Sequence, residues 1–128
     1  MITMNFSKEE QKIYDLTIEL LHAIRKGDVN KYKSLSSVKL TAIEPESNGN
    51  IVEGLDFHEF FLKNSTPIDY HLELVNPVIK VNNDSAYIAY TLINTALVGG
   101  DFELQSFNET RIYFKEENNW KMVHFHRS

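Results

Sequence analysis

The fold is decided by the stretch SAYIAYTLINTALVGGDFELQSFNETRIYFKEENNWKMVHFHR, residues 85–127. It consists of long runs rich in β-branched and aromatic residues, separated by short groups of Gly, Asn and acidic residues. Such groups between strand-like runs are typical of β-hairpins. A similar run precedes the stretch, so the pattern predicts an antiparallel meander of four strands over residues 68–81, 85–98, 102–115 and 119–127.

Two features of this meander predict a curved sheet with a local irregularity. Some of the strands exceed the usual length, and long strands suit a strongly curved antiparallel sheet. Asn76 and Pro77 lie inside the first run. Because proline cannot donate a hydrogen bond to the next strand, these two residues predict an edge strand or a bulge.

The first half of the chain predicts helices. A capping-box pattern at Ser7 and Glu10, an apolar stripe at helical spacing, and Gly27 as a stop signal predict a helix over residues 7–26. A short second helix is expected over residues 28–35.

A third helix is predicted over residues 57–64. Asp56 and Glu59 repeat the capping-box pattern at its start. Its phenylalanines recur at helical spacing and are expected to face the core. The residues expected to fill the interior are Phe57, Phe60, Phe61 and, from the last strand, Phe125.

The order of these elements predicts the α+β class. Short strands within residues 38–46 and 51–54 connect the helical half to the meander. Helices followed by a long antiparallel meander are typical of α+β folds, and one face of the sheet needs a cover. We therefore expect a single domain over residues 1–128, in which the long N-terminal helix packs in a curved mixed or antiparallel sheet. Such a cone-shaped fold encloses an internal cavity.

Composition excludes several classes of function. The 128 residues are 42% hydrophobic and 24% charged, which suits one globular domain. The absence of cysteine excludes disulfide scaffolds, thiolate nucleophiles and thiolate zinc sites. A net charge of −5 argues against partners such as nucleic acid or an anionic membrane. No apolar run approaches the ~20 residues of a membrane helix, and no export signal is evident, so we expect a cytoplasmic protein.

Two arginines are expected among inward-facing residues. Because side chains alternate along a strand, Arg111 shares a face with Glu109, and Arg127 shares a face with Phe125. A buried guanidinium group needs an ionic partner or a solvated pocket. One interpretation is a structural ion pair, for instance from Arg111 to Glu109, to Glu44 or to the C-terminal carboxylate at Ser128. The other is a pocket that accepts an anion, since guanidinium groups bind carboxylates through two parallel hydrogen bonds.

The last strand carries an HxH pair, His124 and His126. Regular alternation places Trp120 and Met122 on the same face as this pair, opposite Phe125. Such a pair binds zinc or iron only with a third ligand, and the spacing identifies none, so we expect no metal site. The aromatic neighbour favours a packed face, with Trp120, His124 and His126 as candidates for an interface.

His58 and two glutamates are the remaining candidates for chemistry. Three roles are open for His58: a solvated side chain, a pocket wall or a general base, and the helix N-terminus favours its neutral form. Glu44 and Glu46 flank Pro45, which favours one buried, hydrogen-bonded carboxylate and one solvated carboxylate over an acid–base pair. The sequence contains no Gly-rich phosphate loop, no G-x-S-x-G elbow and no HExxH motif, so no cofactor is expected.

Residues 40–61, LTAIEPESNGNIVEGLDFHEFF, resemble the association (hub) domain of calcium/calmodulin-dependent protein kinase II. The resemblance covers nearly the whole chain. The wider superfamily has the cone-shaped nuclear transport factor 2-like fold, also described as SnoaL-like or cystatin-like. Four further segments agree in order: LLHAIRKGDVNKY at 20–32, SAYIAYTLI at 85–93, NETRIYF at 108–114 and NWKMVHFHRS at 119–128.

This resemblance implies assembly and a ligand pocket. Hub domains pair into dimers, and the dimers close into two stacked rings that gather kinase domains at the periphery. They also hold a deep pocket, lined by arginines and a histidine, that accepts small carboxylates. His58, Arg111 and Arg127 match pocket positions, and Tyr90 and Glu109 complete the expected pocket.

The chain also departs from the family. Leu92 stands where another pocket arginine is expected, the connection after the third helix is short, and the aromatic residue at the pocket lip is missing. The sequence has no Gly-rich ATP loop, no HRD or DFG motif and no basic calmodulin-binding helix. We therefore expect a freestanding domain that associates with itself, with a small carboxylate as ligand and without a kinase or calmodulin partner.

Two other functions stay open. Cones of this superfamily also house isomerases, dehydratases and hydrolases. In such an enzyme His58 would be the base, while Arg111 and Arg127 would hold a carboxylate substrate. The third possibility is a binder without catalysis, in which the carboxylate biases ring assembly.

Overall fold

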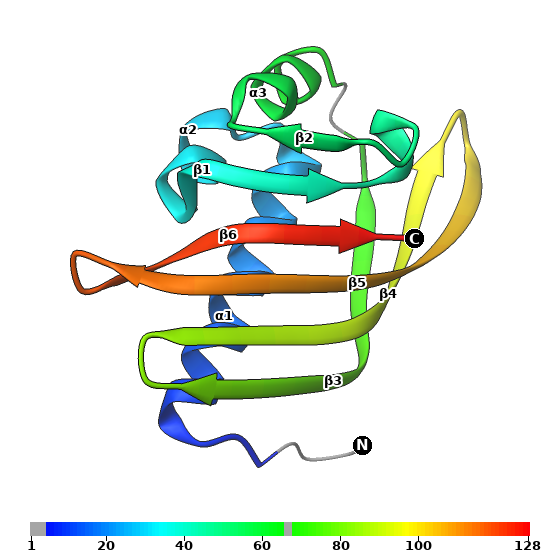
Figure 1. Ribbon diagram of the computed structural model, residues 1–128. Coiled ribbons are helices and arrows are strands. Elements are labelled where there is room, and N and C mark those ends of the chain that lie inside the picture. The colour runs from blue at the N-terminus through cyan, green and yellow to red at the C-terminus, as the bar shows by residue number, and fades with distance from the viewer. Residues whose placement is uncertain (1–4, 66–67) are drawn as a thin grey trace.

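The computed structural model describes residues 5–65 and 68–128, and these form helices and a single β-sheet (Figure 1). The predicted helices and the meander are confirmed to within a few residues. A short 3₁₀ turn, Pro45–Ser47, connects the first two strands. The elements are α1 (Lys8–Lys26), α2 (Val29–Leu35), β1 (Ser36–Ile43), β2 (Ile51–Glu53), α3 (Asp56–Lys63), β3 (Tyr70–Asn82), β4 (Ser85–Val98), β5 (Asp101–Glu116) and β6 (Asn119–Arg127).

Helix α1 begins and ends at its predicted capping residues. The backbone N–H of Glu10 donates to Ser7 Oγ at 3.2 Å, and the N–H of Ser7 donates to Glu10 Oε1 at 2.7 Å. These bonds provide acceptors for N–H groups at the start of the helix. At the other end Gly27 has a φ of 67°, and its N–H donates to the carbonyls of Ala23 and Ile24. This left-handed conformation ends the helix.

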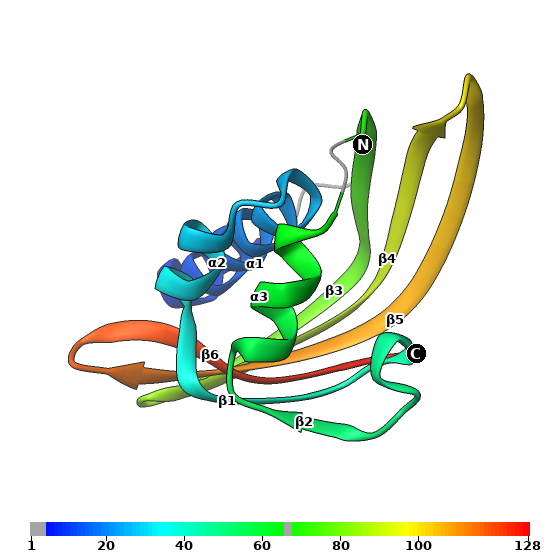
Figure 2. The same ribbon diagram turned by 90° about the horizontal axis from the view of Figure 1, so that it is seen from above.

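The strands form one mixed sheet in the order β2-β1-β6-β5-β4-β3. Neighbouring strands are antiparallel except β1 and β6, which are parallel. The long strands β3, β4 and β5 bend strongly (Figure 2). The register between β3 and β4 shifts between Val75 and Val78, and Asn76 has a φ of 52°. The bulge predicted from Asn76 and Pro77 is therefore confirmed, and it lies on an edge strand.

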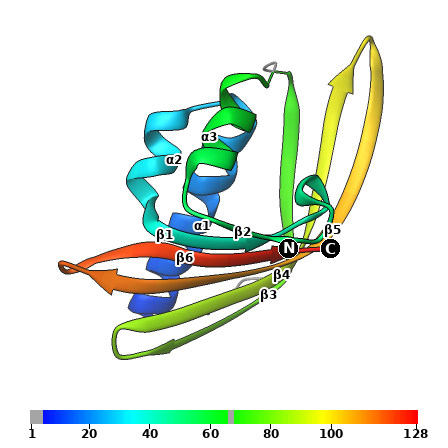
Figure 3. The same cartoon turned by 45° about the horizontal axis from the view of Figure 1, so that its top comes forward.

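The three helices of the described residues all lie on the concave side of the sheet (Figure 3). Helix α1 crosses the strands, and its buried Ile13 and Leu20 belong to one core cluster with Ile88, Tyr113 and Met122. Each such side chain contributes about 1.5–3 kcal/mol when it leaves water. The result is the predicted α+β cone, with a curved sheet wrapped around a long helix. Within the described residues, no helix is both long and apolar enough to cross a membrane.

An irregularity in β6 corrects the predicted faces of this strand. Val123 is an extra residue in the pairing of β5 with β6. Ile112 pairs with His124 and the next residue, Tyr113, pairs with Met122, so Val123 has no partner. A single extra residue reverses the alternation of side chains. Trp120 and Met122 therefore turn inward with Phe125, and all three are buried. The prediction that Trp120 shares a face with the two histidines is wrong.

Helix α3 turns a different face to the core from the predicted one. His58 and Leu62 are each 7% exposed, and a spacing of four residues places them on one side of the helix. The helix starts at Asp56 without a side-chain cap, so the predicted capping box is wrong. Of the phenylalanines expected to fill the cone, Phe125 is buried and Phe57 half-buried, but Phe60 is 70% and Phe61 49% exposed.

Candidate functional site

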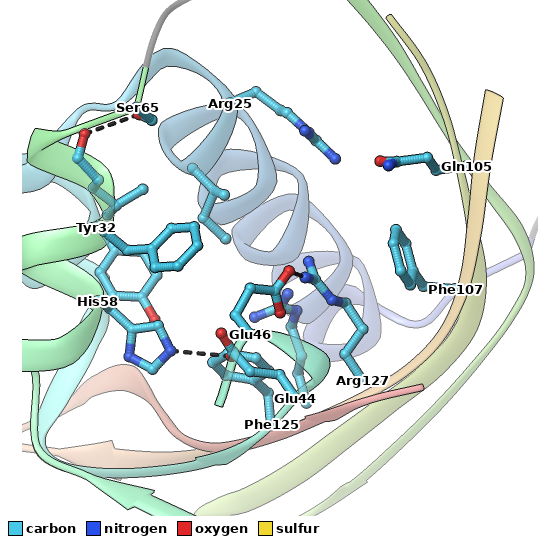
Figure 4. A pocket seen from close by; sticks show the side chains of 14 residues that line it. Arg25, Tyr32, Glu44, Glu46, His58, Ser65, Gln105, Phe107, Phe125 and Arg127 are labelled. Atoms are coloured by element: carbon cyan, nitrogen blue, oxygen red, sulfur yellow. Dashed lines mark hydrogen bonds and ion pairs between the residues drawn. The ribbon is translucent and has the colours of Figure 1, made fainter. Parts of the chain in front are cut away.

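A cavity of about 220 Å³ lies between the helices and the curved sheet (Figure 4). Side chains of α1, α2, α3, β5 and β6 line it, together with the turn after β1. Its wall combines aromatic side chains with ionisable groups, a combination typical of ligand sites. Its acidic and basic side chains are Arg25, Glu44, Glu46, His58, Arg111 and Arg127.

His58 is a wall of this cavity and pairs with Glu44. Its Nε2 lies 3.1 Å from Glu44 Oε2, and both residues are buried. The 3₁₀ turn fixes Glu44, whose carbonyl accepts from the N–H groups of Ser47 and Gly49. The imidazole ring contacts the ring of Phe125, with 5.3 Å between the centres. The expectation of one buried, hydrogen-bonded glutamate in this pair of acidic residues is confirmed for Glu44.

Arg111 reaches the cavity from β5, and each of its nitrogens already donates a hydrogen bond. Nε donates to the Tyr90 hydroxyl at 3.0 Å, Nη2 to Glu109 Oε1 at 3.1 Å and Nη1 to Met122 Sδ at 3.2 Å. Its Cζ lies 4.6 Å from the centre of the Phe125 ring. Burial works against the charge, but the Tyr90 oxygen and the Glu109 carboxylate hold the pKa of Arg111 above its ordinary value. The predicted ion pair with Glu109 is confirmed.

Tyr90 and Glu109 lie behind Arg111, outside the cavity wall. They are 5% and 2% exposed, and neither lines the cavity. The Tyr90 hydroxyl donates to Glu109 Oε1 at 2.5 Å. Burial raises the pKa of Tyr90 well above its ordinary value of 10, so the hydroxyl keeps the proton that it donates. These two residues, expected as pocket residues, instead hold Arg111 in place.

Arg127 forms another side of the cavity and is paired with Glu46. Its Cζ lies 4.5 Å from the centre of the Phe107 ring, a cation–π contact. Burial lowers the pKa of Arg127, the carboxylate of Glu44 opposes this, and the charge of Arg25 adds to it. Structurally, therefore, Arg127 is a cavity cation whose charge is already matched by a carboxylate.

Arg25 is a cavity cation that sequence reasoning missed. It lies in the last turn of α1, where a cation interacts favourably with the helix dipole. This local role was sufficient to explain an arginine at that position, so no role in the cavity was predicted. Figure 4 shows its side chain directed into the cavity, with Gln105 of β5 on the opposite wall. Burial lowers the pKa of Arg25, and the more distant Glu109 and Tyr70 oppose this. One signal was available: Arg25 follows the buried Leu21 by four residues, so it shares the inner side of the helix.

His124 and His126 lie on the outer face of the sheet, away from the cavity. The Nδ1 of His124 and the Oγ1 of Thr41 form a hydrogen bond of 2.7 Å. Burial, and after it the charge of His126, lowers the pKa of His124. Trp120 is on the inner side, where the Lys115 ammonium lies 5.1 Å from its ring centre. In the described part of the chain, no three His, Cys, Asp or Glu residues are placed to hold a metal ion.

The arrangement suits a small anion with an apolar part. Guanidinium groups recognise carboxylates, and the aromatic rings of Phe61, Phe107 and Phe125 cover the apolar wall. The group able to move a proton is the imidazole of His58, oriented by Glu44.

Known proteins related to this chain match it along almost its whole length. The family model of the calcium/calmodulin dependent protein kinase II association domain matches residues 9–128. The delta subunit of calcium/calmodulin-dependent protein kinase type II from Oryctolagus cuniculus is 37% identical over 126 residues, which are 93% of this chain and 23% of that protein. The alpha chain from Drosophila melanogaster is 35% identical over 127 residues, 95% of this chain and 24% of that protein. The chain thus spans about a quarter of the length of these relatives.

Solved structures show the same fold. The association domain of the C. elegans kinase has a TM-score of 0.88 and 32% identity, with 94% of this chain and 95% of that chain covered. The hub homology domain from Chlamydomonas reinhardtii has a TM-score of 0.89 and 29% identity, with 95% and 98% covered. A nuclear transport factor 2-like protein from Salmonella enterica, 22% identical, has a TM-score of 0.75 over 93% and 89% of the two chains. The expected cone-shaped fold is confirmed.

Proposed function

This chain belongs to the family of calcium/calmodulin-dependent protein kinase II association domains, and on that premise we propose that it is a single homo-oligomerisation domain whose cavity binds a small carboxylate. The resemblance expected from residues 40–61 is thereby confirmed at the level of the family. The kinase activity of the longer relatives is not part of the proposal for this chain.

The proposal of self-association rests on the outer face of the sheet. The helices of the described residues cover only the concave side (Figures 2 and 3). Among the described residues, strands β4, β5, β6 and β1 place no carboxylate, ammonium or guanidinium group in the middle of the opposite face, and Lys80 and Glu53 lie at its two edges. Two rows of neighbours from adjacent strands cross it, namely Tyr87, Ile112, His124 and Thr41, followed by Ala89, Thr110, His126 and Ile43.

Apolar side chains on this face are open to solvent. Tyr87 is 40%, Val78 48% and Ile51 66% exposed. Apolar side chains exposed on a sheet face that no helix covers indicate a site of interaction, and sheets pack face to face through β-branched and aromatic side chains. A second copy of the same face supplies a surface of matching chemistry and forms a contact with two-fold symmetry. The occupant that we propose is therefore another copy of this chain.

Size-exclusion chromatography with light scattering tests this proposal. The wild-type protein is expected at a multiple of 14.9 kDa at micromolar concentration. Tyr87→Glu places a carboxylate in the proposed contact and is expected to reduce the mass. Phe60→Glu is the matched control, because Phe60 is exposed on the helical side. A wild-type monomer, or equal effects of the two folded variants, would contradict the proposal.

The carboxylate-binding part rests on the guanidinium groups that line an aromatic cavity. A ligand that binds the folded state raises the melting temperature. We expect millimolar acetate or phenylacetate to stabilise the protein, and sodium chloride at the same ionic strength to leave the melting temperature unchanged. If neither carboxylate raises the melting temperature, the proposal of carboxylate binding is contradicted, whereas the proposal of self-association is not affected.

A second candidate function is an enzyme that acts on a carboxylic acid. The observation that favours it is the buried pair of His58 and Glu44, because a carboxylate that orients an imidazole is typical of a general base. Turnover of a carboxylic substrate that is lost in His58→Ala but kept in Phe60→Ala would support this function. Turnover that survives in His58→Ala would exclude His58 as the base.

A further inference from the structure

We propose that Arg25 at the open end of the cavity, and not Arg111 on β5, binds the carboxylate of the ligand. This rests on the proposed function, namely that the cavity accepts a small carboxylate. It goes further because it assigns the binding group and the charge of the ligand.

The cavity is lined by several basic side chains, and in the described part of the chain most of them have a carboxylate beside them. His58 lies 3.1 Å from Glu44, Arg127 is paired with Glu46, and Arg111 lies 3.1 Å from Glu109. Each pair combines a basic group with one carboxylate. A ligand that bound to Arg111 would compete with Glu109, and the atoms of the other two groups that lack a partner, His58 Nδ1 and Arg127 Nε, are buried.

Arg111 is the least available of them. Its side chain is 1% exposed, and all three of its nitrogens donate to Tyr90, Glu109 or Met122. Moving this guanidinium group toward a ligand would leave Glu109 buried without a cation, which is strongly unfavourable. Arg111 therefore serves the structure, and the ligand needs another anchor.

Arg25 is the cation that remains. Among residues 5–65 and 68–128 it has no carboxylate within 4.0 Å, whereas the other two arginines each have one. Figure 4 shows its guanidinium group directed into the cavity, toward the wall that carries Gln105. Gln105, Phe61 and Ser65 are exposed, so this is the end through which a ligand enters.

This position also accounts for the departure at Leu92. Leu92 is 2% exposed, belongs to the core cluster and does not line the cavity. No cation therefore enters the cavity from β4. Arg25 supplies one from helix α1 instead, and the ligand's carboxylate would lie nearer to α1 and the open end.

The charges define the class of ligand. Among the described residues Arg25 is the arginine without a carboxylate within 4.0 Å, and one guanidinium group suits a single carboxylate. The rest of the ligand would contact Phe61 and Phe107 beside it. The ligand class is therefore a monocarboxylate with an aromatic or branched apolar part, small enough for a cavity of about 220 Å³.

Titration calorimetry with phenylacetate, and with phenylacetamide as a neutral analogue, tests the assignment. Arg25→Gln is expected to weaken phenylacetate binding about tenfold or more, because a charge-assisted hydrogen bond is lost. Arg25→Lys keeps the charge and is expected to restore part of the affinity. Lys26→Gln, which removes the neighbouring exposed cation, is the matched control and leaves the affinity unchanged. Equal affinity of Arg25→Gln and wild type would overturn the assignment.

Chemical modification gives a readout that does not depend on the variants. The chain has three arginines, so peptide mapping after reaction with phenylglyoxal assigns each one. We expect phenylacetate, but not phenylacetamide, to protect Arg25. Protection of Arg111 or Arg127 alone would overturn the proposal. If phenylacetate binds to no variant and protects no arginine, the carboxylate part of the proposed function fails together with this inference, whereas the light-scattering result tests self-association separately.

Discussion

A single buried guanidinium group organises the base of the cavity. Arg111 and Glu109 are both almost completely buried, and Tyr90 joins them through its hydroxyl. The cost of removing two charges from water is offset only because the pair is close and hydrogen-bonded on several sides. The residues around Arg111 are therefore coupled, so the effect of one substitution on the free energy of unfolding should depend on whether its neighbours are also substituted.

This coupling predicts how substitutions combine. Arg111→Met leaves the Glu109 carboxylate buried without a cation and is expected to lower the free energy of unfolding by about 3–5 kcal/mol. Adding Glu109→Gln removes that charge and is expected to recover about 2 kcal/mol through the coupling of neighbouring residues. Urea unfolding followed by circular dichroism at one protein concentration measures both values. If the two substitutions destabilise additively, the ion pair is not the main interaction of Arg111.

His124 predicts how stability depends on pH. Burial, with a smaller contribution from His126, holds the pKa of His124 below its ordinary value of 6.5, so the folded state favours the neutral ring. The unfolded chain binds the proton more readily, and stability is therefore present above pH 6.5 and falls as the pH drops through the lower folded pKa. His124→Gln is expected to reduce this loss on acidification, measured by urea unfolding at several pH values. His71→Gln is the control, because His71 is exposed. If the free energy of unfolding of His124→Gln falls with pH as steeply as that of the wild type, the prediction is contradicted.

At the scale of elements, the end of α1 is held by a glycine that has little free space. Gly27 has a φ of 67°, and a Cβ placed on it would lie 3.2 Å from Ser65 Oγ and 3.3 Å from the Leu62 carbonyl. The turn that ends α1 is thus packed against the end of α3. This contact helps to set the position of Arg25, two residues earlier in the chain.

Substitution of this glycine separates backbone strain from crowding. A left-handed conformation costs an L-residue about 1–2 kcal/mol, and Gly27→Ala adds the close contacts to that cost. Gly99 has a φ of 58°, but a Cβ added to it would meet no heavy atom within 4 Å, so Gly99→Ala carries the conformational cost alone. Thermal and urea unfolding should show a larger loss of stability for Gly27→Ala than for Gly99→Ala. Equal losses would mean that the contact with α3 contributes nothing.

Periodicity predicted most of the elements, and its failures have identifiable physical causes. The capping box at Ser7 and the turn groups between strands act locally, so the ends of α1 and of the meander could be predicted. The bulge at Val123 could not, because one extra residue reverses the faces of a strand without a signal in composition. The buried face of α3 was missed because it depends on the hydrogen bond between His58 and Glu44. These two residues belong to different segments, so local spacing does not predict their contact. Arg25 was missed because a cation at a helix end has a sufficient local explanation.

At the scale of the whole molecule, the two proposed activities use opposite faces of one sheet. The concave face, covered by the helices, holds the cavity with Arg25, whereas the outer face presents Tyr87 and the two histidines. Strands β5 and β6 contribute residues to both faces. Assembly on one side and ligand binding on the other therefore depend on the same strands, although their key residues are separate and can be changed independently.

This separation leads to a prediction about thermal unfolding. If a second copy covers the outer face, unfolding includes dissociation, so the melting temperature of the wild type should rise by a few degrees over a hundredfold increase in protein concentration. Tyr87→Glu is expected to melt at one temperature whatever the concentration, because the charge prevents burial of the face. Arg25→Gln, on the other face, should keep the wild-type dependence on concentration. Differential scanning calorimetry measures all three, and a wild-type melting temperature that does not change with concentration would show that the outer face stays uncovered in solution.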